Sequence, residues 1–291
     1  MPDIVTLNRL ADLLGVDLNY FSGNPAGISG IDSAEQAGRG TAHAMPAGKQ
    51  ESNERPAWDL SRGNWVDADF SGLTGLHEKF SASNMQRCRF IGSELSGLLL
   101  KHNNVDSCNF SGSDISNSRI EGSNLPANNF TGCLLKGTTF SESNLDRCDF
   151  TNATLSGTQF LKSFLYGCHL TGTDFTGAVL KASGLSGIKT NSEQQNTLQH
   201  TVWKRTSFID TQLADLEFTG TLDECVVENC KFTRVSFREV TFRNTFFKNN
   251  RNLKRVRFTA CRADRMSYEF LKQGKADLSG IVLLAPGEEE A

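Results

Sequence analysis

The chain has 291 residues, 38% of them hydrophobic, and a formal net charge of −3 at pH 7. This length suits one large domain or two small ones, and the charge by itself points to no strongly charged partner. No apolar run reaches the roughly 20 residues of a membrane-spanning helix, and the N-terminus lacks the pattern of a secretion signal. The composition therefore excludes a helical membrane protein and predicts a soluble, intracellular one.

Residues 1–23 have the pattern of a short helical segment, with several leucines on one face and Gly15 as a stop signal. The segment resembles the last two helices of the Cro/C1-type helix-turn-helix domain. The recognition helix of that domain, which reads base edges in the major groove, has no counterpart here, so the resemblance implies an incomplete, regulator-like segment. An amphipathic cap or a dimerisation helix is the alternative. The matching residues are Pro2, Thr6, Leu7, Leu10, Ala11, Leu14, Gly15, Val16, Leu18, Tyr20 and Phe21.

Residues 24–55 are rich in Gly, Ala, Ser and Gln and show no apolar periodicity. This composition predicts a flexible linker. The same segment could serve as an export signal if the protein were a secreted effector.

Apolar residues then recur at every fifth position, without a polar member between Phe80 and Leu185. A small residue usually lies two positions before each of them. A period of five fits neither a helix nor a plain strand, so it indicates a repeat architecture. The series is Phe80, Met85, Phe90, Leu95, Leu100, Val105, Phe110, Ile115, Ile120, Leu125, Phe130, Leu135, Phe140, Leu145, Phe150, Leu155, Phe160, Leu165, Leu170, Phe175, Leu180 and Leu185.

Segments such as SGSDI (111–115), DRCDF (146–150) and TGTDF (171–175) resemble the units of the pentapeptide-repeat family. The resemblance implies an all-β solenoid, a right-handed quadrilateral parallel β-helix. The residues themselves favour the same arrangement, because alternate residues of an extended segment point the same way and stacked strands lie about 4.8 Å apart. Phenylalanines repeat at intervals of twenty, which indicates four-sided coils and one continuous ladder of Phe70, Phe90, Phe110, Phe130 and Phe150.

The register predicts the domain organisation. A first β-helical part covers 56–187, with an irregular corner at Gly75; an inserted loop covers 188–202; a second β-helical part covers 203–268. The second part loses one residue before Leu222 and gains one before Leu253. Residues 269–291 leave the repeat and are expected to form a C-terminal cap and an acidic tail, since an open coil end would promote aggregation.

All eight cysteines occupy the small position that faces inward, where a free thiol behaves as a compact apolar group. We therefore expect packing and neither disulfides nor metal binding, and the spacing fits no zinc site. No catalytic constellation and no cofactor motif is present, so we predict a protein that is not an enzyme. The cysteines are Cys88, Cys108, Cys133, Cys148, Cys168, Cys225, Cys230 and Cys261.

Charge is unevenly distributed along the chain. Residues 56–187 carry ten Lys and Arg against twelve Asp and Glu, whereas residues 231–265 carry eleven against two. A basic patch is the electrostatic footprint of a polyanion-binding protein, and Arg234 and Arg255 should stack on one face. A solvated charged face is the alternative. The candidate binding residues are Arg234, Arg238, Arg243, Lys248, Arg251, Lys254, Arg255 and Arg257.

The leading hypothesis is a noncatalytic binding or regulatory scaffold of the bacterial cytoplasm, whose basic coils contact nucleic acid or an acidic partner. The family resemblance implies an alternative, a DNA mimic that binds DNA gyrase and protects it from quinolones. That activity uses a strongly acidic rod, a property that only the weakly acidic first coils approach. The sequence does not identify the macromolecular partner, and homodimerisation through the terminal segments stays open. No membrane contact is expected.

Overall fold

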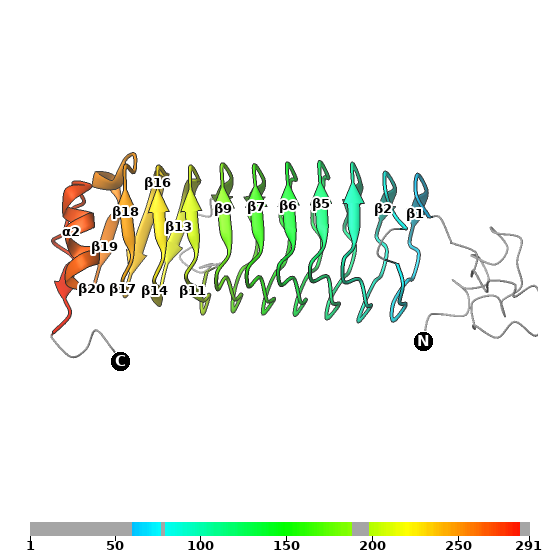
Figure 1. The fold of residues 1–291 in the computed structure, drawn as a ribbon, viewed down its shortest axis with the longest axis horizontal. Coiled ribbons are helices and arrows are strands. Elements are labelled where there is room, and N and C mark those ends of the chain that lie inside the picture. The colour runs from blue at the N-terminus through cyan, green and yellow to red at the C-terminus, as the bar shows by residue number, and fades with distance from the viewer. Residues whose placement is uncertain (1–59, 77–78, 188–197, 286–291) are drawn as a thin grey trace, which may run out of the picture. The chain divides into compact units, whose positions relative to one another are not determined.

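The structure is a computed structural model that describes residues 60–76, 79–187 and 198–285. In these ranges short parallel strands stack into a β-solenoid, in which each coil pairs with the next (Figure 1). The segments expected to be a helical, regulator-like start (1–23) and a linker (24–55) lie outside the described residues. The parallel β-solenoid predicted from the repeat is confirmed.

The coil has four sides, numbered here in chain order. Side 1 contains β1 (Asn64–Val66), β2 (Asn84–Gln86), β4 (Asn104–Asp106), β8 (Phe164–Tyr166), β10 (Gly184–Ser186) and the first halves of β13 (Gln212–Phe218) and β16 (Lys231–Arg238). Side 2 contains the second halves of β13 and β16, with β19 (Arg257–Thr259). Side 3 contains β11 (Trp203–Lys204), β14 (Thr221–Asp223), β17 (Thr241–Arg243), β20 (Cys261–Ala263) and β21 (Ile281–Leu283). Side 4 contains β3 (Leu99–Lys101), β5 (Arg119–Glu121), β6 (Thr139–Ser141), β7 (Gln159–Leu161), β9 (Val179–Lys181), β12 (Ser207–Ile209), β15 (Val226–Glu228) and β18 (Phe246–Lys248).

The register between coils confirms the four-sided arrangement. Ile120 pairs with Phe140, and Phe140 with Phe160, so like positions lie twenty residues apart. On side 2 the predicted phenylalanine ladder is present, and its rings from Phe70 to Phe150 stack with centroids 5.0, 4.7, 5.1 and 5.0 Å apart. These rings are almost completely buried, so the core is a column of side chains inside the tube.

The coil is irregular at Gly75, as the sequence predicted. Gly75 has a left-handed φ of 73° and is exposed, while the neighbouring Leu76 is only 1% exposed. Leu76 therefore takes the inward position that the five-residue register assigns to residue 75. A left-handed residue without a Cβ allows the chain to make this extra bend.

The offset between coils changes at three places. Leu185 pairs with Leu213, which accommodates the inserted segment, and Leu213 pairs with Phe232, one residue short of the usual interval. Phe237 pairs with Phe258, one residue beyond it. The loss and the gain of one residue inferred from the sequence are thus confirmed.

The last part of the segment expected to be a loop (188–202) belongs to a coil. Leu198 is fully buried, and the Thr201 hydroxyl donates to the Leu170 carbonyl at 2.8 Å. Val202 forms a parallel bridge with Asp174. The coil therefore resumes at Leu198, before the first position that the register marks as apolar, Trp203.

Helix α2 (Arg265–Gln273) and strand β21 lie at the C-terminal end of the stack (Figure 1). The Asp264 carboxylate caps the helix by accepting from the Ser267 amide at 2.6 Å. Phe270 packs on Phe246 of β18, with ring centroids 5.0 Å apart, and β21 pairs with β20. The helix begins at Arg265, inside the range assigned to the repeat (203–268), because Asp264 ends the coil as a helix N-cap.

Candidate polyanion-binding surface

The eight candidate residues do not form one continuous surface. Five lie along side 1, its corner with side 2 and the start of side 2; they are Arg234, Arg251, Lys254, Arg255 and Arg257. The other three are distributed around the coil, with Arg238 at the end of β16, Arg243 in β17 on side 3 and Lys248 in β18 on side 4. We call the first five residues, together with Lys231, the basic edge.

Three of the eight are held by a carboxylate one coil earlier. Arg238 lies 2.7 Å from Glu217, and Lys248 lies 2.9 Å from Glu228. Arg234 forms a two-point pair with Asp215, in which its terminal nitrogen donates to the second carboxylate oxygen at 2.8 Å. This hydrogen bond raises the pKa of the Arg234 guanidinium above its usual value. These pairs neutralise much of the charge that the sequence suggested.

Arg251, Arg255 and Arg257 differ from those three. Among the residues that the structure describes, no carboxylate lies within ion-pair distance of their side chains, and all three are exposed. The preceding coil offers positive charge instead, because Lys231 is the direct bridge partner of Arg251. Like charges opposite each other across a strand pair are destabilising. Apart from Arg234, whose charge Asp215 neutralises, the basic edge therefore carries charge that no carboxylate of the described residues compensates within ion-pair distance.

A cavity of about 310 Å³ opens within the basic edge. It lies where the coil gains its extra residue, because 252–256 leave the strand path and form the short 3-10 helix η2 (Leu253–Arg255). Asn252 adopts a left-handed φ of 63°, and its side-chain amide donates to the Phe232 carbonyl at 3.2 Å. The lining residues are Phe232, Thr233, Arg234, Val235, Ser236, Asn252, Arg255, Val256 and Arg257.

Arg234 and Arg255 both line this cavity, and their stacking on one face stays a prediction. The polar residues Thr233, Ser236 and Asn252, which also line the cavity, were not among the predicted site residues. One signal could have found them, since the extra residue before Leu253 predicts a bulge at this corner. Side chains that face a bulge are no longer covered by the next coil.

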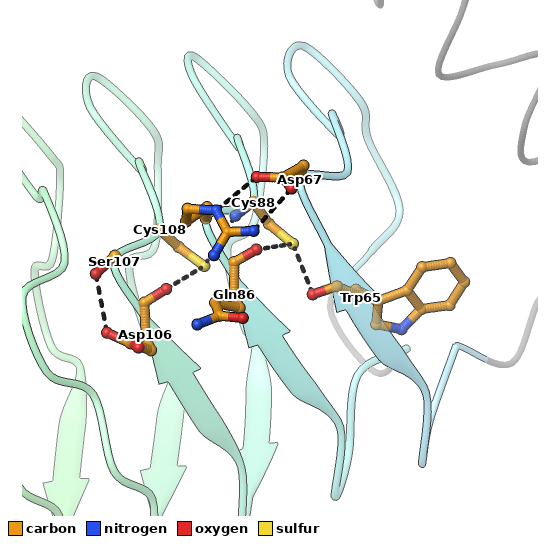
Figure 2. A network of polar contacts seen from close by, with 8 residues as sticks. Trp65, Asp67, Gln86, Cys88, Asp106, Ser107 and Cys108 are labelled. Carbon is orange, nitrogen blue, oxygen red and sulfur yellow. Dashed lines mark hydrogen bonds and ion pairs between the residues drawn. The ribbon is translucent and has the colours of Figure 1, made fainter.

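The cysteines lie in the interior of the tube. All eight cysteines are buried and free, as predicted. Burial raises the pKa of the Cys133 thiol to about 12 and that of the Cys230 thiol to about 12. Figure 2 shows the usual arrangement, in which the Cys88 thiol lies beside the carbonyls of Trp65 and Gln86, at 3.4 and 3.7 Å. These thiols pack and hydrogen-bond to the backbone.

Two further features of the described ranges bear on function. Within 60–76, 79–187 and 198–285, no group of three or more His, Cys, Asp or Glu could hold a metal ion. No helix in those ranges has the length and apolar character needed to cross a bilayer.

The family model for the pentapeptide repeat region matches residues 83–160, within the first β-helical part. This model describes a structural repeat and indicates no catalytic family. Among curated proteins no similar sequence was found.

Several solved structures are similar to parts of this chain. HetL, a pentapeptide repeat protein involved in heterocyst differentiation regulation from the cyanobacterium Nostoc sp. strain PCC 7120, is 16% identical, with a TM-score of 0.32, over 68% of this chain and 88% of its own. Full-length QnrB1, a plasmid-mediated fluoroquinolone resistance protein, is 16% identical, with a TM-score of 0.31, over 77% and 92%. A pentapeptide repeat protein from the Arabidopsis thaliana thylakoid lumen is 21% identical, with a TM-score of 0.30, over 32% and 66%.

Proposed function

We propose that this chain is a noncatalytic scaffold of the bacterial cytoplasm that binds nucleic acid through its basic edge. One observation carries the proposal: Arg251, Arg255 and Arg257 have no carboxylate partner among the described residues and stack against a coil that is itself basic. Phosphates along a nucleic-acid backbone would supply the missing negative charge. Rigid stacked coils would hold the arginines in fixed positions without rearrangement.

The pairing pattern elsewhere in the solenoid supports this choice. Several charged residues on other coils face opposite charges on the adjacent coil, as in Arg87 with Asp67 and Lys162 with Glu142. Such pairs leave little net field at a distance. The basic edge departs from this pattern, and uncompensated charge at the surface is what attracts a polyanion.

The alternative interaction with DNA gyrase requires an acidic, DNA-like surface. On side 1 of the first coils, a ladder of exposed asparagines is linked by side-chain hydrogen bonds of 2.6 to 3.1 Å. An amide ladder carries no charge, so the observed chemistry does not favour this alternative. The ladder consists of Asn64, Asn84, Asn104, Asn124 and Asn144.

Fluorescence anisotropy with labelled duplex DNA, repeated over a range of salt concentrations, tests the proposal. Binding should weaken steeply as salt rises, with a logarithmic slope of about −0.9 for each phosphate contacted. Changing Arg251, Arg255 and Arg257 to Gln should reduce both the affinity and this slope.

The matched control removes the same charge from the ion-paired residues Arg87, Arg147 and Lys162. Equal losses in the two triple variants would show that net charge, and not the basic edge, determines binding. The proposal fails if the native chain does not bind duplex DNA in dilute salt. Capture of an acidic protein in its place would assign the basic edge to the other partner class.

A further inference from the structure

The cavity in the basic edge has a donor set suited to one compact anion. Arg255 and Arg257 reach it from η2 and the start of β19, and Arg234 reaches it from β16. Thr233 and Ser236 add half-buried hydroxyl groups from the same strand. Guanidinium groups and hydroxyls are the side chains that bind phosphate oxygens most effectively.

The net positive charge at the cavity favours an anion with two negative charges. Asp215 neutralises Arg234 but occupies only two of its five N–H donors, so Arg234 retains donors without contributing net charge. Arg255 and Arg257 have no carboxylate partner among the described residues, which leaves two positive charges. A phosphomonoester carries a charge of about −1.5 to −2 at neutral pH, whereas a carboxylate or a phosphodiester carries only one.

The size of the cavity agrees with this balance. A volume of about 310 Å³ lies at the lower end of the range of about 300–1,000 Å³ for small-molecule sites. It accommodates a phosphate group with little more than an attached sugar. The Asn252 side chain, bonded to the Phe232 carbonyl, holds the bulge that forms one wall.

We propose that this cavity binds a phosphomonoester group, such as the terminal phosphate of a nucleotide or an oligonucleotide. The inference rests on the same basic edge as the proposed function and adds a specific anchor to it. Backbone phosphodiesters would contact the open part of the edge, and a terminal phosphate would enter the cavity.

Isothermal titration calorimetry of the full chain with inorganic phosphate at constant ionic strength provides the first test. Phosphate should bind at one site at pH 7.5 and more weakly at pH 5.5, because the dianion that predominates at pH 7.5 is largely converted to the monoanion at pH 5.5. Sulfate stays dianionic over this range, so its affinity should not change. Phosphate binding that is undetectable, or equal at both pH values, overturns the inference.

Transverse-relaxation-optimised NMR then locates the site. Saturable shifts should be confined to amides of 232–236 and 252–257. Changing Arg255 and Arg257 together to Gln should weaken phosphate binding by at least tenfold, because two charged hydrogen-bond donors are lost. The Arg87→Gln variant changes an arginine that is likewise exposed and lies outside the cavity, and it should bind phosphate like the native chain. Shifts spread over many arginines would show nonspecific screening and overturn the inference.

Two oligonucleotides separate this inference from the proposed function. A single strand with a 5′-phosphate should bind at least tenfold more tightly than the same strand with a 5′-hydroxyl. Equal affinities would leave nucleic-acid binding intact and overturn the phosphomonoester site. Binding of inorganic phosphate without binding of either strand would retain the site and reject the proposed function.

If the Arg255→Gln, Arg257→Gln double variant does not fold, the Arg255→Lys variant provides the measurement. Lysine keeps the positive charge but lacks the planar guanidinium, whose N–H donors can bind two phosphate oxygens at once. Phosphate should therefore bind several-fold more weakly, while duplex DNA binding changes little. An unchanged phosphate affinity in Arg255→Lys would remove Arg255 from the site.

Discussion

Arg234 and Asp215 form a two-point ion pair between adjacent coils, at the same corner where Arg255 of the following coil has no carboxylate within ion-pair distance among the described residues. The corner residues of three successive coils are therefore Asp215, which is acidic, and Arg234 and Arg255, which are basic. The first two neutralise each other. The third contributes its charge to the basic edge.

This relationship predicts a gain of binding when the acid is removed. In Asp215→Asn the Arg234 side chain stays in place but is no longer neutralised, so the affinity for phosphate and for duplex DNA should rise several-fold. Anisotropy and calorimetry measure the two affinities. As a control, Asp67→Asn frees the equivalent Arg87 far along the chain and should leave phosphate binding unchanged. Weaker binding in Asp215→Asn would mean that Asp215 orients Arg234 for the ligand.

The stacked phenylalanines predict where the solenoid is most sensitive to mutation. Phe130 is 1% exposed and stacks between Phe110 and Phe150. Phe130→Ala should lower the free energy of unfolding by about 3–5 kcal/mol, because it removes a buried ring and leaves a cavity. Chemical denaturation measures this change. The same replacement at Phe164, whose side chain is 51% exposed, should cost much less, and equal losses would contradict the ladder as the main source of stability.

Gly187 is required for close approach of the chain to the next coil. A Cβ there would lie 2.1 Å from the Asp215 backbone carbonyl oxygen, far inside van der Waals contact. Gly187→Ala should therefore lower the thermal midpoint. Gly132 is the control, because a Cβ there meets nothing within 4 Å and only the left-handed φ of 65° is strained. That strain costs about 1–2 kcal/mol, and a similar corner already holds Ala127. A larger drop of the thermal midpoint in Gly132→Ala than in Gly187→Ala would contradict close approach as the reason for glycine at position 187.

The buried thiols predict that the solenoid loses stability in alkaline solution. Burial raises the pKa of the Cys133 thiol from 9.0 to about 12, so between these values the unfolded chain releases a proton that the folded chain retains. Stability should therefore be fully present below pH 9 and should fall as the pH rises toward 12. Denaturant midpoints across this range measure the effect. The stability of the Cys133→Ala variant should fall less steeply with pH. An unchanged dependence of stability on pH would exclude this thiol as a cause.

Much of the fold could be predicted because the repeat is local. Each five-residue unit places its own apolar residue inward, as Phe130, Leu135 and Phe140 do, and the twenty-residue spacing of phenylalanines gives the number of sides. The inward position of the cysteines follows from the same local rule. These features require no knowledge of distant parts of the chain.

The candidate site could be predicted only in part. The excess of basic residues and the closeness of Arg234 to Arg255 could be predicted, because both follow from composition and register. The ion pairs of Arg234 with Asp215, Arg238 with Glu217 and Lys248 with Glu228 could not be predicted from the sequence.

The repeat, the four sides, the buried ladder and the places where the register shifts all follow from the amino-acid sequence. Which charges face each other depends on the folded coil, because the offset between coils changes from 20 to 28, 19 and 21 residues. Each change alters every neighbour on the following coil. The cavity has the same origin, since the extra residue opens a cavity only where the adjacent coil continues without it.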